Sequence, residues 1–198
     1  MGVGGWMFFG VVVGIIVWMT AVYHGLVALR NRCRSAFSQI EVQLRRRYDL
    51  IPNLLETVQG YTAHERETLD AVNATRSGAV QAAWRAAAEP GRTETMRDLV
   101  QAEAHLAGAL RRLVAVVEGY PRLKANENML AVRAELTSTE HRVAFTRQGY
   151  NDAALEYNVR RERFPASLIA TLFAFAPAAI LPAPDGVQDY STPRVSAR

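Results

Sequence analysis

Cysteine and lysine are almost absent from this sequence. Cys33 is the only cysteine among 198 residues, so no disulfide can form within the chain, and nothing argues for an oxidising compartment. Lys124 is the only lysine, and arginine therefore supplies nearly all of the positive charge. The formal net charge is only +4, while 49% of the residues are hydrophobic. The chain is thus long and apolar enough for one domain with a real core plus one membrane segment.

The familiar catalytic and metal-binding motifs are missing as well. The sequence contains no GxSxG, no glycine-rich phosphate-binding loop and no CxxC. His64-Glu65 begins like the metalloprotease pattern HExxH, but Thr68 stands where the second histidine ligand belongs. Glu103 and His105 are two residues apart, whereas the carboxylate-bridged metal sites of four-helix bundles use Glu-x-x-His. We therefore predict no enzymatic activity, no cofactor and no metal site.

Residues 2–29 carry no Asp, Glu, Lys or Arg. A membrane-spanning helix needs about 20 apolar residues, and the run from Trp6 to Tyr23, extendable to Leu29, meets that need. Trp6 lies at one end, and Trp18 and Tyr23 lie near the other, as in an aromatic belt. A cleaved signal peptide would need a positively charged start and a small-residue cleavage site, which this segment lacks. We predict that residues 1–29 form an uncleaved transmembrane anchor.

Basic residues lie on only one side of the predicted span. Arg30, Arg32 and Arg34 follow it, so the positive-inside rule predicts a single-pass membrane protein with its N-terminus outside and its helical domain in the cytoplasm. Within the span, Gly10 and Gly14 form a GxxxG pattern that can bring two helices together. Glycine is common in spans in any case, so the incidental interpretation is favoured over a homo-oligomer.

Arginine is concentrated just after the span. The cluster consists of Arg30, Arg32, Arg34, Arg45, Arg46 and Arg47, offset only by Glu41. Anionic lipid headgroups attract such residues by about 1 kcal/mol each near the surface, which predicts contact with lipid or with a partner. Solvated helix surface that merely fixes the topology is an equally good interpretation. Aromatic residues are not interleaved with the cluster, which argues against nucleic acid. Cys33 lies among these arginines, where an incidental or lipid-modified cysteine is favoured over an activated thiol.

From residue 36 onward the apolar residues follow the period of a helix. The first stripe contains Phe37, Ile40, Leu44, Tyr48, Ile51, Leu55 and Val58. Pro52 falls inside this stripe, which resumes in phase, so we expect a kink or a restart capped by Asp49 rather than a loop. The helix is expected to weaken at Gly60. A capping box at Thr62–Glu65 then predicts a second helix that runs to about Ala88.

Two more helices are predicted after the Pro90-Gly91 turn. Thr93 caps the first, whose apolar positions are broken only by Glu103: Met96, Leu99, Leu106, Leu110, Leu113, Val117 and Tyr120. Pro121 ends it, and Asn126 caps a helix over 127 to about 164. That helix has an apolar or aromatic residue at every seventh position: Met129, Leu136, Val143, Tyr150, Tyr157 and Phe164. A repeat of seven indicates helices packed at shallow angles, as in a bundle or coiled coil.

Several polar side chains fall on or beside these core stripes. They are Glu103, Glu140, Arg147, Tyr150, Asn151, Tyr157 and Asn158. Burying an unpaired carboxylate costs several kcal/mol, so the charged members must pair, stay wet or bind something. Structural pairing, for example of Glu103 with Arg147, is favoured. The alternative is a bundle that binds a ligand or metal, and so an enzyme, through the layer around Glu103, Glu140 and Arg147.

Residues 164–181 carry no charge. Pro165, Pro177 and Pro182 argue against a second span, so we expect this segment to cap the open end of the bundle or to lie on the membrane surface. The bundle domain is predicted to cover residues 30–175, and residues 176–198 are predicted to form a flexible tail.

Three stretches of the sequence resemble the LemA family of bacterial membrane-anchored helical proteins. They read LRNRxxxAxxQIxVQLxRRYDLIPNLxETVxGYxxHExETL over 29–69, YPxLKAN over 120–126 and TExxxAxxRxxYNxxxxxYN over 139–158. The resemblance implies an antiparallel four-helix bundle, occurrence with membrane proteases and small membrane-associated proteins, and one branch that helps to build magnetosome membranes. It implies no reaction. We therefore predict an all-α scaffold or adaptor, anchored in the bacterial inner membrane as the resemblance implies, whose partners are the lipid bilayer and a membrane protein.

Overall fold

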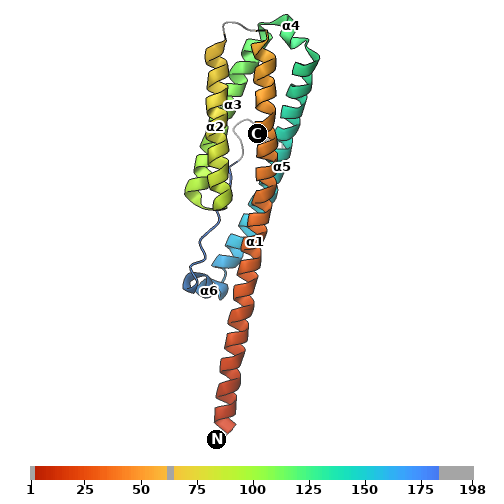
Figure 1. The fold of residues 1–198 in the computed structure, drawn as a ribbon. Coiled ribbons are helices and arrows are strands. Elements are labelled where there is room, and N and C mark those ends of the chain that lie inside the picture. Colours follow the sequence, from red (N-terminus) through yellow and green to blue (C-terminus); the bar gives the residue numbers. More distant parts are fainter. Residues whose placement is uncertain (1–2, 62–64, 183–198) are drawn as a thin grey trace, which may run out of the picture.

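The computed structural model describes residues 3–61 and 65–182, and every regular element in these ranges is an α-helix. The helices are α1 (Val3–Gln59), α2 (Arg66–Ala88), α3 (Thr93–Glu118), α4 (Pro121–Lys124), α5 (Glu127–Glu162) and α6 (Ala166–Leu172). The predicted all-α class is confirmed. So is its layout, with one long apolar helix at the N-terminus followed by packed helices (Figure 1).

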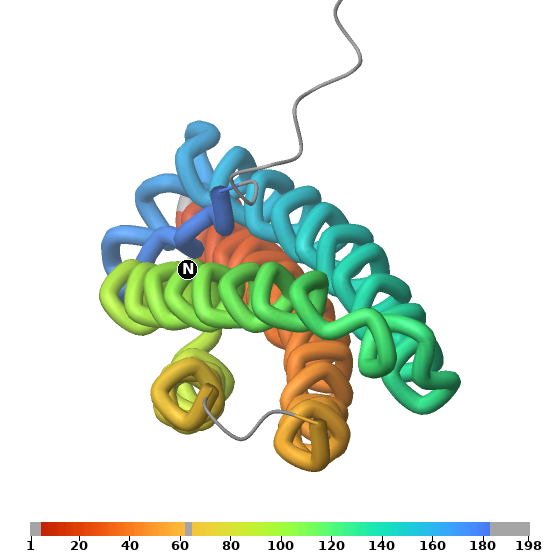
Figure 2. The backbone as a smooth tube through the Cα atoms, turned by 90° about the horizontal axis from the view of Figure 1, so that it is seen from above, coloured from red at the N-terminus to blue at the C-terminus, as the bar shows by residue number. Residues whose placement is uncertain are grey.

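The four long helices run alternately up and down. α1 packs most extensively against α5 and α2 against α3, and α1 also contacts α2. The short helix α4 joins α3 to α5 at the end of the bundle far from the N-terminus (Figure 1). Seen from above, α2 and α5 lie at opposite sides of the bundle (Figure 2). The N-terminal part of α1 projects alone beyond the other helices.

Helix α1 is continuous for 57 residues, or about 85 Å at 1.5 Å per residue. Pro52 lies inside it, so the predicted restart capped by Asp49 is wrong. A proline removes the hydrogen bond to the carbonyl four residues earlier, which here belongs to Tyr48. That carbonyl instead accepts a 2.7 Å hydrogen bond from Nε of Arg76 in α2. The helix continues because its freed acceptor has a partner and because the apolar stripe on both sides of Pro52 stays buried.

The other helix ends largely match the sequence signals. Asn126 caps α5, since its side chain accepts a 3.1 Å hydrogen bond from the backbone N–H of Met129. Thr93 is the first helical residue of α3 rather than its cap, and the capping position, Arg92, makes no side-chain capping bond. α1 ends one residue before Gly60. The predicted capping box falls mostly on residues 62–64, outside the described residues.

Candidate functional site

The N-terminal part of α1 projects beyond the other described helices (Figure 1). Its apolar side chains from Trp6 to Trp18 are all exposed, which would be unfavourable in water. Among the described residues, α1 is the one helix long and apolar enough to cross a membrane. Gly10 and Gly14 lie in this exposed part with open space around them, and their role in self-association stays a prediction.

Arg47 lies inside the bundle, which corrects its predicted place in a lipid-facing cluster. Its side chain is only 7% exposed and forms two ion pairs, at 2.8 Å to Glu103 and at 3.1 Å to Glu140. Successive residues of a helix point about 100° apart, so three consecutive arginines cannot share one face. Arg47 follows Leu44 by three residues and precedes Ile51 by four, so it belongs to the buried stripe.

Glu103 is the centre of this polar network. One carboxylate oxygen accepts from the Arg47 guanidinium, and the other accepts a 2.5 Å hydrogen bond from the Tyr48 hydroxyl. Burial, and then the negative charge of Glu103, raise the pKa of Tyr48, so its hydroxyl stays protonated and donates. The structural pairing predicted for Glu103 is thus present, but its partner is Arg47 and not Arg147. Glu140, which pairs with the same Arg47, is the solvent-accessible member of the network, with its side chain 56% exposed.

Arg147 faces the C-terminal segment instead. Its guanidinium donates a hydrogen bond to the backbone carbonyl of Pro182. Burial lowers the pKa of Arg147, and the negative charge of nearby Glu103 opposes that shift. The charge of Glu103 therefore acts on Arg147 at a distance, and the two side chains form no ion pair in the described structure.

The remaining arginines of the predicted cluster do not form one surface. Arg45 pairs with Glu41 at 3.2 Å and Arg46 with Glu135 at 2.8 Å, and all of these ion pairs are at least partly exposed. Arg32 reaches across to Glu156 of α5 at 2.6 Å. Arg30 and Arg34 are exposed and line a cavity of about 630 Å³ beside Tyr157, at the end of the bundle nearest the apolar part of α1. Their contact with lipid stays a prediction.

The repeated Tyr-Asn pairs of α5 hold an extended C-terminal segment. The Tyr157 hydroxyl donates to the carbonyl of Ala176 at 2.8 Å. The Asn158 side chain then exchanges two hydrogen bonds with the backbone of Ala178, donating to its carbonyl at 2.8 Å and accepting from its N–H at 2.9 Å. The segment 176–182 is therefore bound through its main chain, like a strand added to a sheet edge.

The same pattern recurs one heptad earlier on α5. The Tyr150 hydroxyl donates to Ala179 at 2.7 Å, and Asn151 exchanges bonds of 2.8 and 2.9 Å with Leu181. Seven helical residues rise about 10.5 Å, and three extended residues span about 10 Å, so the two repeats fit. Residues 176–182 were predicted to be flexible, but these bonds hold them on the bundle. Residues 183–198 lie outside the described residues.

Gly91 allows the segment to lie close to the α2–α3 turn. Its φ of +90° belongs to a region that side chains with a Cβ rarely adopt. Its carbonyl accepts a 2.8 Å hydrogen bond from the N–H of Ala179, and an added Cβ would lie 3.4 Å from Ala178. The positive φ therefore favours glycine at this turn, whereas the added Cβ would make only an ordinary van der Waals contact with Ala178.

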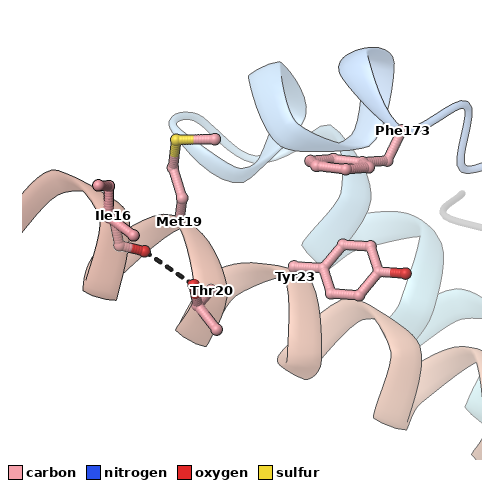
Figure 3. Close-up of a pocket in the computed structure, with 5 residues that line it drawn as sticks. All are labelled: Ile16, Met19, Thr20, Tyr23 and Phe173. Carbon is pink, nitrogen blue, oxygen red and sulfur yellow. Dashed lines mark hydrogen bonds between the residues drawn. The ribbon is translucent and has the colours of Figure 1, made fainter.

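Helix α6 lies below the bundle beside the apolar part of α1 (Figure 1). Its inner residues Ala166, Ile169 and Ala170 are buried. Just beyond its end, the Phe173 ring packs edge-on against Tyr23 of α1 with 4.9 Å between ring centroids (Figure 3). At seven residues α6 is far too short to span a membrane, in agreement with the sequence argument against a second span.

Cys33 is not an activated thiol. It is buried, and its Sγ donates a 3.1 Å hydrogen bond to the carbonyl of Ala153. Burial raises the pKa of Cys33, so the reactive thiolate is disfavoured. In the part of the chain that the structure describes, no group of three or more His, Cys, Asp or Glu side chains could hold a metal ion.

An exposed apolar helix that continues into a packed helical bundle is the structure of a membrane-associated helical-bundle protein. The chain belongs to the LemA family, whose model matches residues 36–196. Two similar proteins, magnetosome proteins MamQ 2 and MamQ 1 of Paramagnetospirillum magneticum, are each 26% identical over 179 residues. The matches cover 83% of this chain and 66% of each relative, so the chain spans just under two thirds of their length. Magnetosome protein MamQ of Magnetospirillum gryphiswaldense is 24% identical over 182 residues, covering 83% of this chain and 67% of the relative.

Proposed function

We propose that this LemA-family protein is a non-enzymatic scaffold or adaptor that holds its bundle at the cytoplasmic face of the inner membrane for a membrane-protein partner. The observation that carries the proposal is that the polar side chains inside the bundle bind other groups of the same chain. Arg47 binds two carboxylates, and the Tyr-Asn pairs bind the chain's own backbone. The alternative of a ligand-binding layer around Glu103, Glu140 and Arg147 is weakened, because Arg47 already satisfies both carboxylates.

The outer face of α5 is where we expect the partner to bind. Phe145 is 78% exposed, and Leu155 and Val159 are also exposed on this helix. At 100° per residue the three lie within about 80° of one another around the helix, and thus on one face. An exposed apolar stripe rimmed by polar residues is typical of a protein-binding surface. The relatives' designation as magnetosome proteins is compatible with a role at a membrane.

The orientation can be tested with one introduced cysteine. Lys124 is exposed in α4, at the end of the bundle far from the span. Lys124→Cys should react with a membrane-impermeant maleimide only after the inner membrane is opened. The unaltered chain is the matched control, because its own Cys33 is buried. Labelling of Lys124→Cys in intact cells would place the bundle outside and contradict the proposal.

The scaffold role can be tested by photo-crosslinking in living cells. A benzophenone amino acid at Phe145 should give a discrete adduct with one membrane protein. The same group at Arg111, which is exposed on α3, is the control and should give no such adduct. If Phe145 gives no adduct and native mass spectrometry of the purified protein finds a bound metal or small molecule, the ligand-binding alternative is correct.

A further inference from the structure

We propose that α6 forms a second contact with the bilayer, inserted among the lipid acyl chains of the leaflet from which α1 emerges. The outer face of α6 and its flanks carries Phe164, Leu168, Leu172 and Phe173, which are 50–75% exposed. This face has no covering element among the described residues, and residues 164–181 contain no charge. The inference rests on the proposed anchoring by α1 and adds a lipid contact that the anchor alone does not require.

The position of α6 along α1 sets its depth. A cleft between them is lined by Ile16, Met19, Thr20 and Tyr23 of α1 and by Phe173 (Figure 3). Residues 6–23 of α1 rise about 26 Å, and a hydrocarbon core is about 30 Å thick. If the part that contacts α6 lay in water, the described apolar helix would keep only residues 3–15, or about 20 Å. The apolar part of α1 therefore matches the thickness of the hydrocarbon core best when the residues beside α6 lie at the depth of the acyl chains.

The backbone of this region suits an apolar environment. The N–H groups of Phe173, Ala174 and Phe175, where α6 ends, all donate to carbonyls of α6 itself at 2.9–3.2 Å. The hydroxyls of Thr20 and Thr171 likewise donate to carbonyls of their own helices, each at 2.9 Å. Polar groups that are satisfied locally lose little when lipid replaces water.

Arginines surround this apolar region at the height expected for headgroups. α1 and α5 are antiparallel, and the Arg32–Glu156 ion pair fixes which residues lie level. Arg160 and Arg163, further along α5, lie beside Leu29 of α1. They are exposed, as Arg30 and Arg34 are. Cationic side chains directly above an inserted apolar face are the arrangement by which interfacial helices bind anionic membranes.

The cleft between α1 and α6 fits an acyl chain better than a polar ligand. Its volume is about 220 Å³, and it has two polar side chains. The Thr20 hydroxyl already donates to Ile16, and the Tyr23 hydroxyl points away from Ile16 and Met19 (Figure 3). Small-molecule sites are usually larger, at about 300 Å³ or more, and carry unpaired polar groups that orient a ligand. A lipid acyl chain in the cleft would continue the apolar surface of the span.

The test measures the depth of spin labels on the full-length protein in vesicles of anionic phospholipid. Single cysteines replace Leu168 on α6, Val11 in the span and Leu130, an exposed apolar residue at the far end of α5. The background carries Cys33→Ser, which keeps the donor to Ala153. The label at Leu168 should collide more often with oxygen than with a water-soluble nickel chelate, as the label at Val11 does. The label at Leu130 should show the reverse.

The three labels separate this inference from the proposed anchor. A label at Leu168 that behaves like Leu130, while Val11 is embedded in lipid, refutes the insertion of α6 and leaves the anchor intact. If Val11 is accessible to the nickel chelate, the anchor itself is wrong, and the inference falls with it. A label at Leu172, one turn further along α6, should repeat the Leu168 result.

Discussion

Arg47 should matter far more to stability than its two neighbours. Arg45, Arg46 and Arg47 are consecutive, and each forms at least one ion pair, but only Arg47 is buried. Arg47→Met leaves Glu103, whose side chain is 15% exposed, with the Tyr48 hydroxyl as its one remaining donor among the described residues. Breaking a buried ion pair from one side costs about 3–5 kcal/mol. At about 2–4 °C per kcal/mol, the melting temperature should fall by about 6–20 °C.

The neighbouring positions provide matched controls. Arg46→Met removes an ion pair in which the two side chains are 53% and 34% exposed, and such pairs contribute about 0.2–1 kcal/mol. Arg45→Met removes an exposed pair between residues four apart in one helix, worth about 0.3–0.5 kcal/mol. The assay is thermal unfolding of the three full-length variants in the same detergent, followed by circular dichroism.

A double variant distinguishes an unpaired charge from a simple loss of packing. Arg47→Met combined with Glu103→Leu removes both buried charges, and Tyr48 can still donate to the carbonyl of Ala79, at 3.4 Å. Removing both partners of a buried pair is often nearly neutral, so the double variant should be more stable than the sum of the single effects requires. Equal melting temperatures for the three single arginine variants would refute the reasoning. Strict additivity in the double variant would also refute it.

Three further predictions concern Tyr48, Cys33 and Asn158. The pKa of Tyr48 is raised in the folded state, so the phenol of the unfolded chain ionises first. The free energy of unfolding, measured by urea titration, should therefore fall as the pH rises above about 10, and it should fall less steeply in Tyr48→Phe. The same dependence of this free energy on pH in both proteins would contradict the prediction. Cys33 should react slowly with a thiol reagent in the native protein and at once in denaturant, whereas fast native labelling would show that it is accessible. Asn158→Ala removes both hydrogen bonds to Ala178. Limited proteolysis should therefore cut this variant within residues 176–182 sooner than it cuts Asn128→Ala, a control at an exposed position on α5. Identical digestion of the two variants would count against the tethering role of Asn158.

The helices could be predicted from the sequence because their signals are local. Apolar spacing, the Asn126 cap and the proline positions depend only on neighbours along the chain, and the boundaries they predict hold within a few residues. The partner of Glu103 could not be predicted in this way, because it depends on how α1 is rotated against α3. One signal was nonetheless present, since Arg47 stands at a position of the buried stripe, whereas Arg45 and Arg46 do not.

The sequence of the bound C-terminal segment contains no pattern from which its binding to the bundle could be predicted. An extended chain held through its main chain needs no particular side-chain period, so residues 176–182 look like a flexible tail. The signal lay on the other side of the contact, in two Tyr-Asn pairs one heptad apart. The tyrosine rings are buried as predicted, but each hydroxyl and amide reaches out of the core to the segment rather than into a polar layer.

The hydrogen bonds of the Tyr-Asn pairs also fix how far α6 can move from the bundle. The chain leaves α5 at Glu162 and is bound to the same helix again at Ala176, so α6 sits in a loop closed at both ends by one rigid element. It cannot drift deeper or shallower on its own. Where the bilayer is thicker or thinner, a rigid unit of this kind must follow the headgroups as a whole, and the mismatch is left to the tilt of α1. With α6 inserted as proposed, the length of the chain between α5 and Ala176 would set the spacing between the membrane surface and the bundle, and lengthening that loop by a few residues would release it.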